Sequence, residues 1–215
     1  MPTTHVRPFT RADRIGLNGL VNAHLAAVMP GASLSVQALL SHLEAEPGEF
    51  IVDRWVAERR TLAADQDGRI VAAAQLLRYG DGPEVGPAYR DAAEIAWLVC
   101  WPAAPFWPDS EEASWTLLQA ALDQIVTWGV ARCYADGSLP VVGVYGVPDA
   151  WPHIRALYHR AGFVSGREEI VLACAVADLP ARTPHDWMIT RQLGVNGVRF
   201  SACLLYTSPS PRDRS

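Results

Sequence analysis

Two runs of residues typical of β-strands lie close together in the first half of the chain. They cover residues 61–64 and 69–78, and only Asp65-Gln66-Asp67-Gly68 separates them. A connection this short joins antiparallel neighbours, because parallel strands need a crossover of a dozen or more residues. The sequence therefore predicts a β-hairpin, and any fold of this chain must accommodate one antiparallel strand pair.

Helical and strand-like segments alternate around this hairpin. Further strands are expected at 5–9, 94–101, 130–134 and 163–176, and helices at 10–25, 33–43, 109–128 and 149–161. Ser33 or Ser35 can cap the second helix, and Asp109 and Glu112 have the spacing of a capping box. The expected buried residues are Ile15, Leu17, Leu20, Val21, His24 and Leu25 in the first helix, and Trp115, Leu118, Leu122, Ile125 and Val126 in the third. This order predicts an α/β (α+β) domain with helices around a mixed sheet.

Composition and charge exclude several classes of function. The 215 residues are 50% hydrophobic and carry a net charge of −5, which gives no footprint for nucleic acid or for an anionic membrane surface. No apolar run approaches the roughly 20 residues of a spanning helix, and no secretory signal is evident. The cysteines form no CxxC pair, which favours buried thiols in a cytoplasmic protein. They are Cys100, Cys133, Cys174 and Cys203.

The C-terminal residues have the composition of a tail. Residues 203–213 resemble the translation of a transposase-type sequencing adapter, and a natural Ser/Pro-rich tail is the alternative. We therefore expect 203–215 to be non-native and the natural sequence to be interrupted near Ala202. Residues 203–215 take no part in the predicted fold.

One segment resembles a known family. Residues 156–163, Ala-Leu-Tyr-His-Arg-Ala-Gly-Phe, are similar to the fourth-helix signature of the GNAT acetyltransferases, in which a Leu-Tyr pair precedes a Gly-Phe turn. Arg7-Pro8 followed by Thr10 and Asp13 resembles the first strand and helix of that family. The resemblance covers roughly residues 5–178. It implies a mixed, mostly antiparallel central sheet flanked by helices.

The cofactor loop departs from the family pattern. In a GNAT protein, a glycine-rich loop after the fourth strand and the following helix N-terminus hold the pyrophosphate of acetyl-CoA. Residues 101–112 contain no Gly and no Arg, and three of them are prolines, which lack the N–H donor. Asp109, Glu111 and Glu112 place negative charge at the start of the helix. We therefore do not expect the GNAT-like part of this chain, roughly residues 5–178, to bind acetyl-CoA in the family's usual manner.

Two residues occupy positions where the family often places its chemistry. The resemblance implies that Tyr158 protonates the departing thiolate and that Glu94 deprotonates the amine through water. The alternatives are a tyrosine packed at the edge of the core and a surface carboxylate at the end of a strand. His153 and His159 are six residues apart, on different helix faces, so we expect no metal site.

Aromatic residues gather near the departing loop. Trp97, Trp101, Phe106 and Trp107 either line a ligand groove or pack the loop onto the domain. The sequence leaves both alternatives open.

The last part of the chain suggests a second domain. After a domain at 1–180, residues 181–202 read as a linker and a hairpin built around Asn196-Gly197. The resemblance then implies a tandem GNAT protein whose second half, against which the first packs, carries the acetyl-CoA site. The expected function is N-acetyl transfer to an amine of a small molecule or of a protein, either at its N-terminus or on a side chain. The alternative is a non-catalytic GNAT-like module that binds a ligand or a partner protein.

Overall fold

The computed structural model describes residues 3–45, 55–102, 110–141, 144, 146–166 and 168. The chain divides into two compact units, Met1–Glu169 and Ile170–Ser215, and every described residue belongs to the first. The predictions for 181–202 and 203–215, and for Cys174 and Cys203, therefore lie outside the described residues. Of the strand expected at 163–176, the described residues 163–166 have no regular secondary structure.

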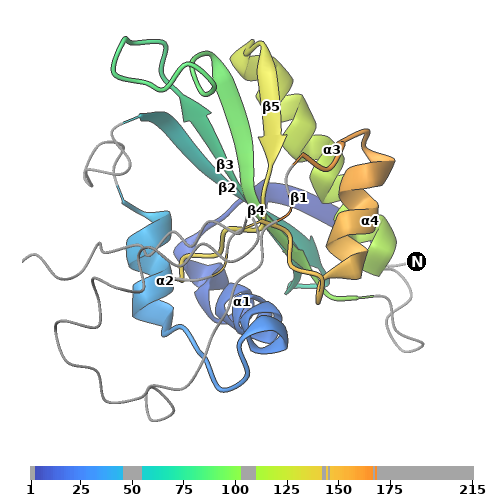
Figure 1. Cartoon of the computed structure of the whole chain (residues 1–215). Helices are drawn as coiled ribbons and strands as arrows, with labels where there is room; N and C mark the ends of the chain where they lie inside the picture. Colours follow the sequence, from blue (N-terminus) through green and yellow to red (C-terminus); the bar gives the residue numbers. More distant parts are fainter. Residues whose placement is uncertain are drawn as a thin grey trace, which may run out of the picture. The chain divides into compact units, whose positions relative to one another are not determined.

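The core of the first unit is a five-stranded sheet in the order β1-β2-β3-β4-β5 (Figure 1). The first four strands are antiparallel neighbours, and β4 and β5 pair in parallel. The expected mixed, mostly antiparallel sheet is thus confirmed. The strands are β1 (Thr4–Pro8), β2 (Val56–Gln66), β3 (Arg69–Tyr79), β4 (Ala92–Cys100) and β5 (Arg132–Ala135).

The predicted hairpin joins β2 to β3. Its loop is only Asp67 and Gly68, with φ of +51° and +78°. Positive φ at both loop residues is the type I′ geometry that matches the twist of the flanking strands, and it explains why Asp-Gly stands there. The Asp65 carboxylate accepts a hydrogen bond from the Gly68 N–H at 3.1 Å, which closes the turn.

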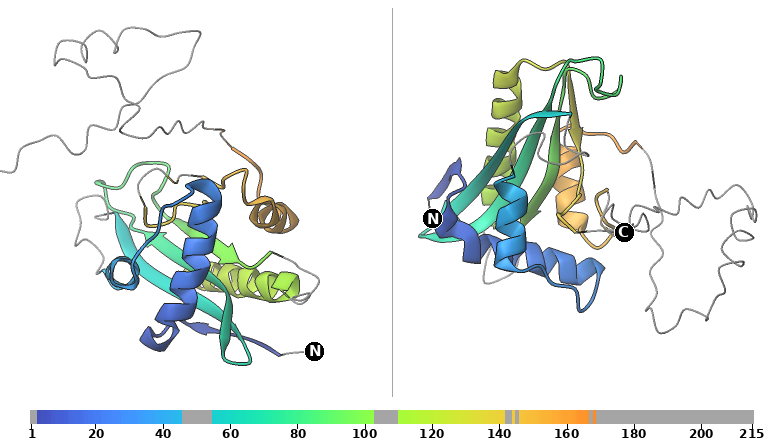
Figure 2. Two further views of the ribbon diagram at one scale, coloured as in Figure 1. Left: turned by 90° about the horizontal axis from the view of Figure 1, so that it is seen from below. Right: turned by 90° about the vertical axis from the view of Figure 1, so that its left-hand side faces the viewer.

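Helices cover both faces of the sheet (Figures 1 and 2). Thr61 of β2 is the register partner of Gln75, so Gln75 and Arg60 point to opposite faces. His42 of α2 reaches Gln75, whereas Gln124 of α3 reaches Arg60, which places the two helices on opposite sides. The helices are the 3₁₀ turn η1 (Arg11–Asp13), α1 (Arg14–Val28), α2 (Val36–Leu43), α3 (Ser110–Trp128) and α4 (Pro152–Arg160). Among the described helices, none has the length and apolar character needed to cross a membrane.

The residues predicted to be buried are correct for α1 with one exception, and partly wrong for α3. In α1 the expected residues are buried except Ile15, which is 65% exposed because it lies two positions, about half a turn, from Leu17. In α3, Leu118 and Ile125 are buried, but Val126 is 77% exposed. The sheet-facing side of α3 also uses small residues that hydrophobicity alone does not reveal. They are Ser110, Ala113, Ser114 and Ala121.

Local signals set the ends of two helices. Ser35 caps α2, since its Oγ accepts a hydrogen bond from the Ala38 N–H at 3.1 Å. At the end of α4, Gly162 has φ of +92°, and the N–H of Phe163 donates to the carbonyl of Tyr158 at 3.0 Å. This is the Schellman geometry, and it confirms the left-handed conformation expected of Gly162. Asp109, of the expected capping box, lies outside the described residues.

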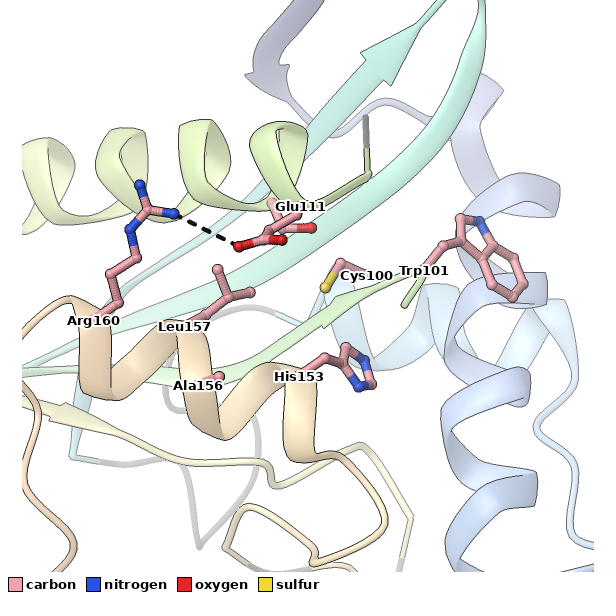
Figure 3. Close-up of a pocket in the computed structure, with 8 residues that line it drawn as sticks. Cys100, Trp101, Glu111, His153, Ala156, Leu157 and Arg160 are labelled. Atoms are coloured by element: carbon pink, nitrogen blue, oxygen red, sulfur yellow. Dashed lines mark ion pairs between the residues drawn. The ribbon is translucent and has the colours of Figure 1, made fainter. Parts of the chain in front are cut away.

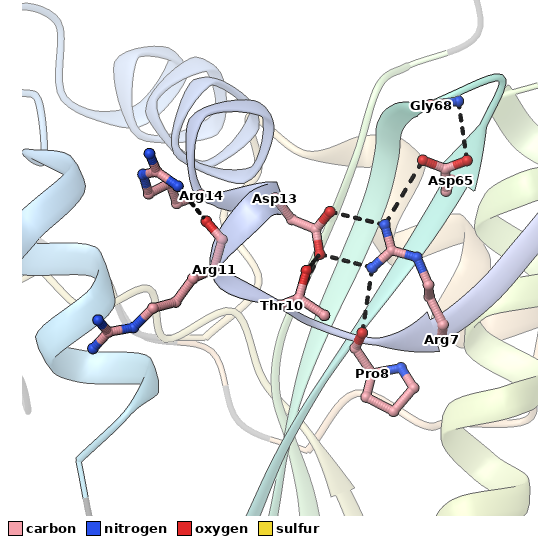
Figure 4. A network of polar contacts seen from close by, with 8 residues as sticks. All are labelled: Arg7, Pro8, Thr10, Arg11, Asp13, Arg14, Asp65 and Gly68. Atoms are coloured by element: carbon pink, nitrogen blue, oxygen red, sulfur yellow. Dashed lines mark hydrogen bonds and ion pairs between the residues drawn. The ribbon is translucent and has the colours of Figure 1, made fainter.

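A charged pair fixes the corner between β1 and η1 (Figure 4). The Arg7 guanidinium donates two hydrogen bonds to the Asp13 carboxylate, at 2.7 and 2.8 Å. The Thr10 N–H donates to the same carboxylate at 2.8 Å. The hydrogen bond from Arg7 is the main reason that the pKa of Asp13 falls to about 2. Arg7, Thr10 and Asp13 therefore stabilise the start of the first helix.

Candidate functional site

The pairing of the parallel strands β4 and β5, the last two strands in the order of the sheet, ends part of the way along β4. They pair from Ala92 to Ile95, and the last hydrogen bonds between them join Asp136 N–H to the Ile95 carbonyl and Ser138 N–H to the Ala96 carbonyl. At the same place β4 contains a bulge, because the register with β3 skips Ala96. Side chains from within β4 and from just after the end of β5 therefore gather around this branch point, which we define as residues 94–96 and 136–138.

Glu94 lies at the branch point and is buried, with 9% of its surface exposed. The hydroxyl of Tyr79 donates a hydrogen bond to Glu94 Oε2. Burial raises the pKa of Glu94, the charge of Asp136 adds to this effect, and the hydrogen bond from Tyr79 opposes it. The alternative of a surface carboxylate at a strand end is thus wrong, because β4 begins two residues earlier, at Ala92.

Tyr158 reaches the branch point from α4, on the other side of the sheet. Its ring is 5% exposed and lies edge-on to Phe163, with 5.5 Å between the ring centroids. Its hydroxyl donates to the backbone carbonyl of Asp136 at 3.1 Å, and burial raises its pKa well above the usual value. Tyr158 is therefore a core tyrosine whose hydroxyl already donates a hydrogen bond. Tyr158 and Glu94 both lie close to the same residue, Asp136.

Asp136 is the residue at this site that sequence reasoning missed. It follows β5 directly, and its carboxylate accepts hydrogen bonds from the Gly137 N–H and the Ser138 hydroxyl, both at 2.7 Å. The signal that was available is an Asp-Gly-Ser sequence directly after a strand. What the sequence does not show is the proximity of this carboxylate to Glu94, because that proximity depends on the parallel pairing of β4 and β5.

Four aromatic side chains lie near the branch point. We define the tyrosine cluster as Trp55, Tyr79, Tyr89 and Tyr134, whose rings pack around Tyr89. The four residues come from separate segments, so no local sequence pattern unites them. The aromatic set expected from sequence behaves differently: Trp97 is fully buried and donates through Nε1 to Gln75 at 3.0 Å, which is core packing. Phe106 and Trp107 lie outside the described residues.

A pocket of about 310 Å³ lies between the end of β4, the start of α3 and one side of α4 (Figure 3). The ion pair of Glu111 and Arg160 stands at one end, and His153 and Trp101 stand at the other. The wall between them is mostly apolar. The lining residues are Cys100, Trp101, Glu111, Ser114, His153, Ala156, Leu157 and Arg160.

His153 pairs with a histidine that its sequence spacing does not suggest. Its Nε2 lies 3.2 Å from Nε2 of His24, a residue of α1 that is 4% exposed. His24 Nδ1 lies 2.9 Å from the Leu20 carbonyl, so in the neutral ring Nδ1 carries the proton and Nε2 accepts. Burial lowers the pKa of both rings, that of His24 to about 4. The described residues contain no group of three or more side chains able to hold a metal ion.

Residues 103–109, most of the predicted cofactor loop, lie outside the described residues, and the described lining of the pocket offers a phosphate little positive charge. Of the eight residues that line it, Arg160 is the single permanent cation. Its guanidinium lies 4.0 Å from the Glu111 carboxylate and 3.9 Å above the Trp115 ring. A phosphate at the start of α3 would therefore meet a carboxylate beside an arginine that is already paired.

Known proteins resemble this chain in fold but not in sequence. No family model matches the chain, and no curated protein matches it in sequence. Among solved structures, a transcriptional regulator from Bacillus halodurans C-125 aligns with a TM-score of 0.55 and 12% identity, over 80% of this chain and 100% of that one. A putative acetyltransferase from Salmonella typhimurium with its cofactor acetyl-CoA aligns with a TM-score of 0.50 and 16% identity, over 75% and 79%. An aminoglycoside N-acetyltransferase in complex with CoA aligns with a TM-score of 0.51 and 11% identity, over 81% and 96%. The described unit thus has a GNAT-like fold.

Proposed function

We propose that this chain takes part in the transfer of an acetyl group from acetyl-CoA to an amine, with Glu94 as the base that removes the proton of the amine. The observation that carries the proposal is the buried Glu94 at the place where β4 and β5 separate in a GNAT-like sheet. An amine is protonated at neutral pH and must lose a proton before it attacks a carbonyl. A carboxylate whose pKa is raised by burial suits that task, because a base works best when its pKa lies near the operating pH.

Tyr158 has a supporting place in the proposal. The family resemblance assigns it the proton that a leaving thiolate takes up, but in this structure its hydroxyl donates to the Asp136 carbonyl. We therefore propose it first as a positioning residue that holds the end of β5 against α4. Glu94 alone carries the proposed proton transfer.

We also propose that the acetyl-CoA site lies in a second GNAT-like half that begins within residues 181–202. Glu94 can then act as the base only if the amine bound to it reaches the thioester held by that half, and the Glu94→Gln variant below tests this condition. This part of the proposal is supported by the ion pair of Glu111 and Arg160 at the start of α3. The same ion pair favours a second candidate function, a non-catalytic GNAT-like module that binds a small molecule or a partner protein. The two candidates differ in whether any acetylated amine is formed.

The test compares the 215-residue chain with a protein that carries a complete second GNAT-like half after residue 180. Each is incubated with acetyl-CoA and a panel of small amines and peptides, and N-acetylated products are identified by mass spectrometry. We expect products from the longer protein, and at least about a hundredfold lower kcat for Glu94→Gln. Glu84→Gln, an exposed loop glutamate, is the matched control and should leave kcat unchanged. Absence of any product from the longer protein would favour the binding module.

A further inference from the structure

We propose that the tyrosine cluster and the two carboxylates behind it form a recognition site for a small organic ammonium ion. The inference adds the chemical class of the amine to the proposed function. It rests on that function only in treating the bound ammonium ion as the amine that is acetylated. The cluster is Trp55, Tyr79, Tyr89 and Tyr134, and the carboxylates are those of Glu94 and Asp136.

The rings of the cluster present faces in several directions. The centroid of Tyr89 lies 4.9 Å from that of Tyr79, 5.6 Å from that of Tyr134 and 6.1 Å from that of Trp55. The interplanar angles are 64°, 56° and 38°, so none of these pairs is stacked in parallel. Tyr89 is 37% exposed and the other three are half-buried, so part of the ring surface is open to solvent, and the Tyr79 hydroxyl joins the cluster to Glu94. An ammonium ion is attracted to such ring faces by their quadrupole.

Two of the ring hydroxyls are held in place. The hydroxyl of Tyr79 donates to Glu94, and the hydroxyl of Tyr134 donates to the Ala88 carbonyl at 2.8 Å. The first bond ties the cluster to the carboxylate, and the second ties β5 to the loop that carries Tyr89. The rings of Tyr79 and Tyr134 are therefore held in place by these bonds, which lowers the entropic cost of binding a ligand.

The charge of the site is uncompensated within the described part of the chain. Neither Glu94 nor Asp136 forms an ion pair there, and the pKa of Glu94 is raised chiefly by burial and further by the charge of Asp136. Two arginines stand nearby but are bound elsewhere. Arg90 donates to the carbonyls of Val85 and Pro83, and Arg132 donates to those of Pro87 and Arg90. A cation placed against Glu94 would relieve the repulsion between the two carboxylates.

The chemistry favours an organic cation over a metal ion. The described residues hold no group of three or more His, Cys, Asp or Glu side chains able to hold a metal ion, and the Tyr79 ring beside Glu94 packs against Tyr89. A methylated or alkylated ammonium ion satisfies both parts of the site, since its charge faces the carboxylate and its carbon atoms contact the rings. The ligand class is therefore a small alkylammonium ion.

The test uses tetramethylammonium, which has no proton to lose and cannot be acetylated, and tert-butanol, a neutral molecule of similar size. Binding of each to the full 215-residue chain is measured by ligand-detected NMR and calorimetry. We expect tetramethylammonium to bind about tenfold more tightly than tert-butanol, as a cation–π site requires. Glu94→Gln and Tyr89→Leu should each weaken its binding about fivefold or more, whereas Tyr89→Phe, which keeps the ring, should not.

Glu84→Gln makes the same charge change as Glu94→Gln on an exposed loop residue and should leave binding unchanged. Equal affinity for the two probes, or an unchanged affinity in Tyr89→Leu, would overturn the inference. Tyr89 is partly exposed, so this variant is informative even where Glu94→Gln disturbs folding. Selective ammonium binding without acetylation of any amine would overturn the proposed function and leave the ammonium site standing.

Discussion

The carboxylate of Glu111, in the first turn of α3, lies 4.0 Å from the guanidinium of Arg160, in the last turn of α4. Arg160 also lies over the Trp115 ring at 3.9 Å. Both ends of the pair are more than half exposed, so it contributes little to stability. Its place matters for the proposed function, because it puts a carboxylate in the first turn of α3, where the family resemblance implies a phosphate site.

The first prediction is that removing this carboxylate exposes an anion site. The unmodified chain should show no saturable binding of acetyl-CoA or pyrophosphate by calorimetry. Glu111→Gln should bind pyrophosphate measurably, because it frees Arg160 beside a helix N-terminus. Glu112→Gln, the adjacent exposed residue, makes the same change of charge without freeing Arg160 and should have a smaller effect. Micromolar binding of CoA by the unmodified chain would contradict our account of the pocket.

The second prediction concerns Asp13, whose pKa is lowered to about 2 chiefly by the hydrogen bond from Arg7. A carboxyl group with a lower pKa in the folded than in the unfolded state stabilises the fold above its unfolded value, near 4, and this contribution is lost as the pH falls toward 2. Asp13→Asn should therefore cost about 2 kcal/mol in urea unfolding at pH 7, and much less near pH 2. The exposed pair of Arg11 and Glu44 supplies the control, since Glu44→Gln should have a clearly smaller effect. Equal losses at both pH values would argue against this role of Asp13.

The third prediction concerns Gly162, at φ of +92° with no atom within 4 Å of an added Cβ. Gly162→Ala should cost about 1 kcal/mol, because the left-handed conformation is disfavoured by a Cβ, and no clash contributes. Gly19→Ala provides a control of opposite sign. Gly19 lies within α1, also with nothing within 4 Å, so alanine should stabilise the helix there. Thermal unfolding of the two variants measures both effects. An unchanged midpoint for Gly162→Ala would refute the expected destabilisation at Gly162.

The fourth prediction concerns His24, whose pKa is lowered to about 4 by burial. The unfolded chain binds a proton near pH 6.5 more readily than the folded one, so stability should fall as the pH drops from about 6.5 toward 4. The loss from this residue at pH 5 is about 2 kcal/mol. His24→Gln should flatten this part of the pH profile, whereas replacing the exposed His5 by Asn should leave the slope in place. A wild-type unfolding free energy that is constant between pH 6.5 and 5 would show that His24 is not held neutral.

The sequence determined the elements and their connections where the cause is local. The loop of Asp67 and Gly68 fixed an antiparallel pair because both residues tolerate positive φ, and Gly162 ended α4 for the same reason. Ser35 and the apolar spacing from Leu17 to Leu25 likewise act within a few residues of chain. The mixed sheet followed from the order of these elements.

Tertiary structure alone decided which distant side chains meet. Glu94 is a buried carboxylate beside Tyr79 and Asp136 because β4 pairs with a strand on each side, and hydrogen bonds between strands carry no signature in local spacing. The pairing of His24 with His153 joins positions 129 residues apart, through the packing of α1 near the start of α4. The exposure of Val126 and the burial of Ser114 followed from which side of α3 faces the sheet, and this depends on the partner surface as much as on the helix itself. The sequence therefore determined where the chain turns and which segments are helix or strand, whereas the geometry of the site arose only when those segments packed, because burial and charge proximity are properties of the assembled core.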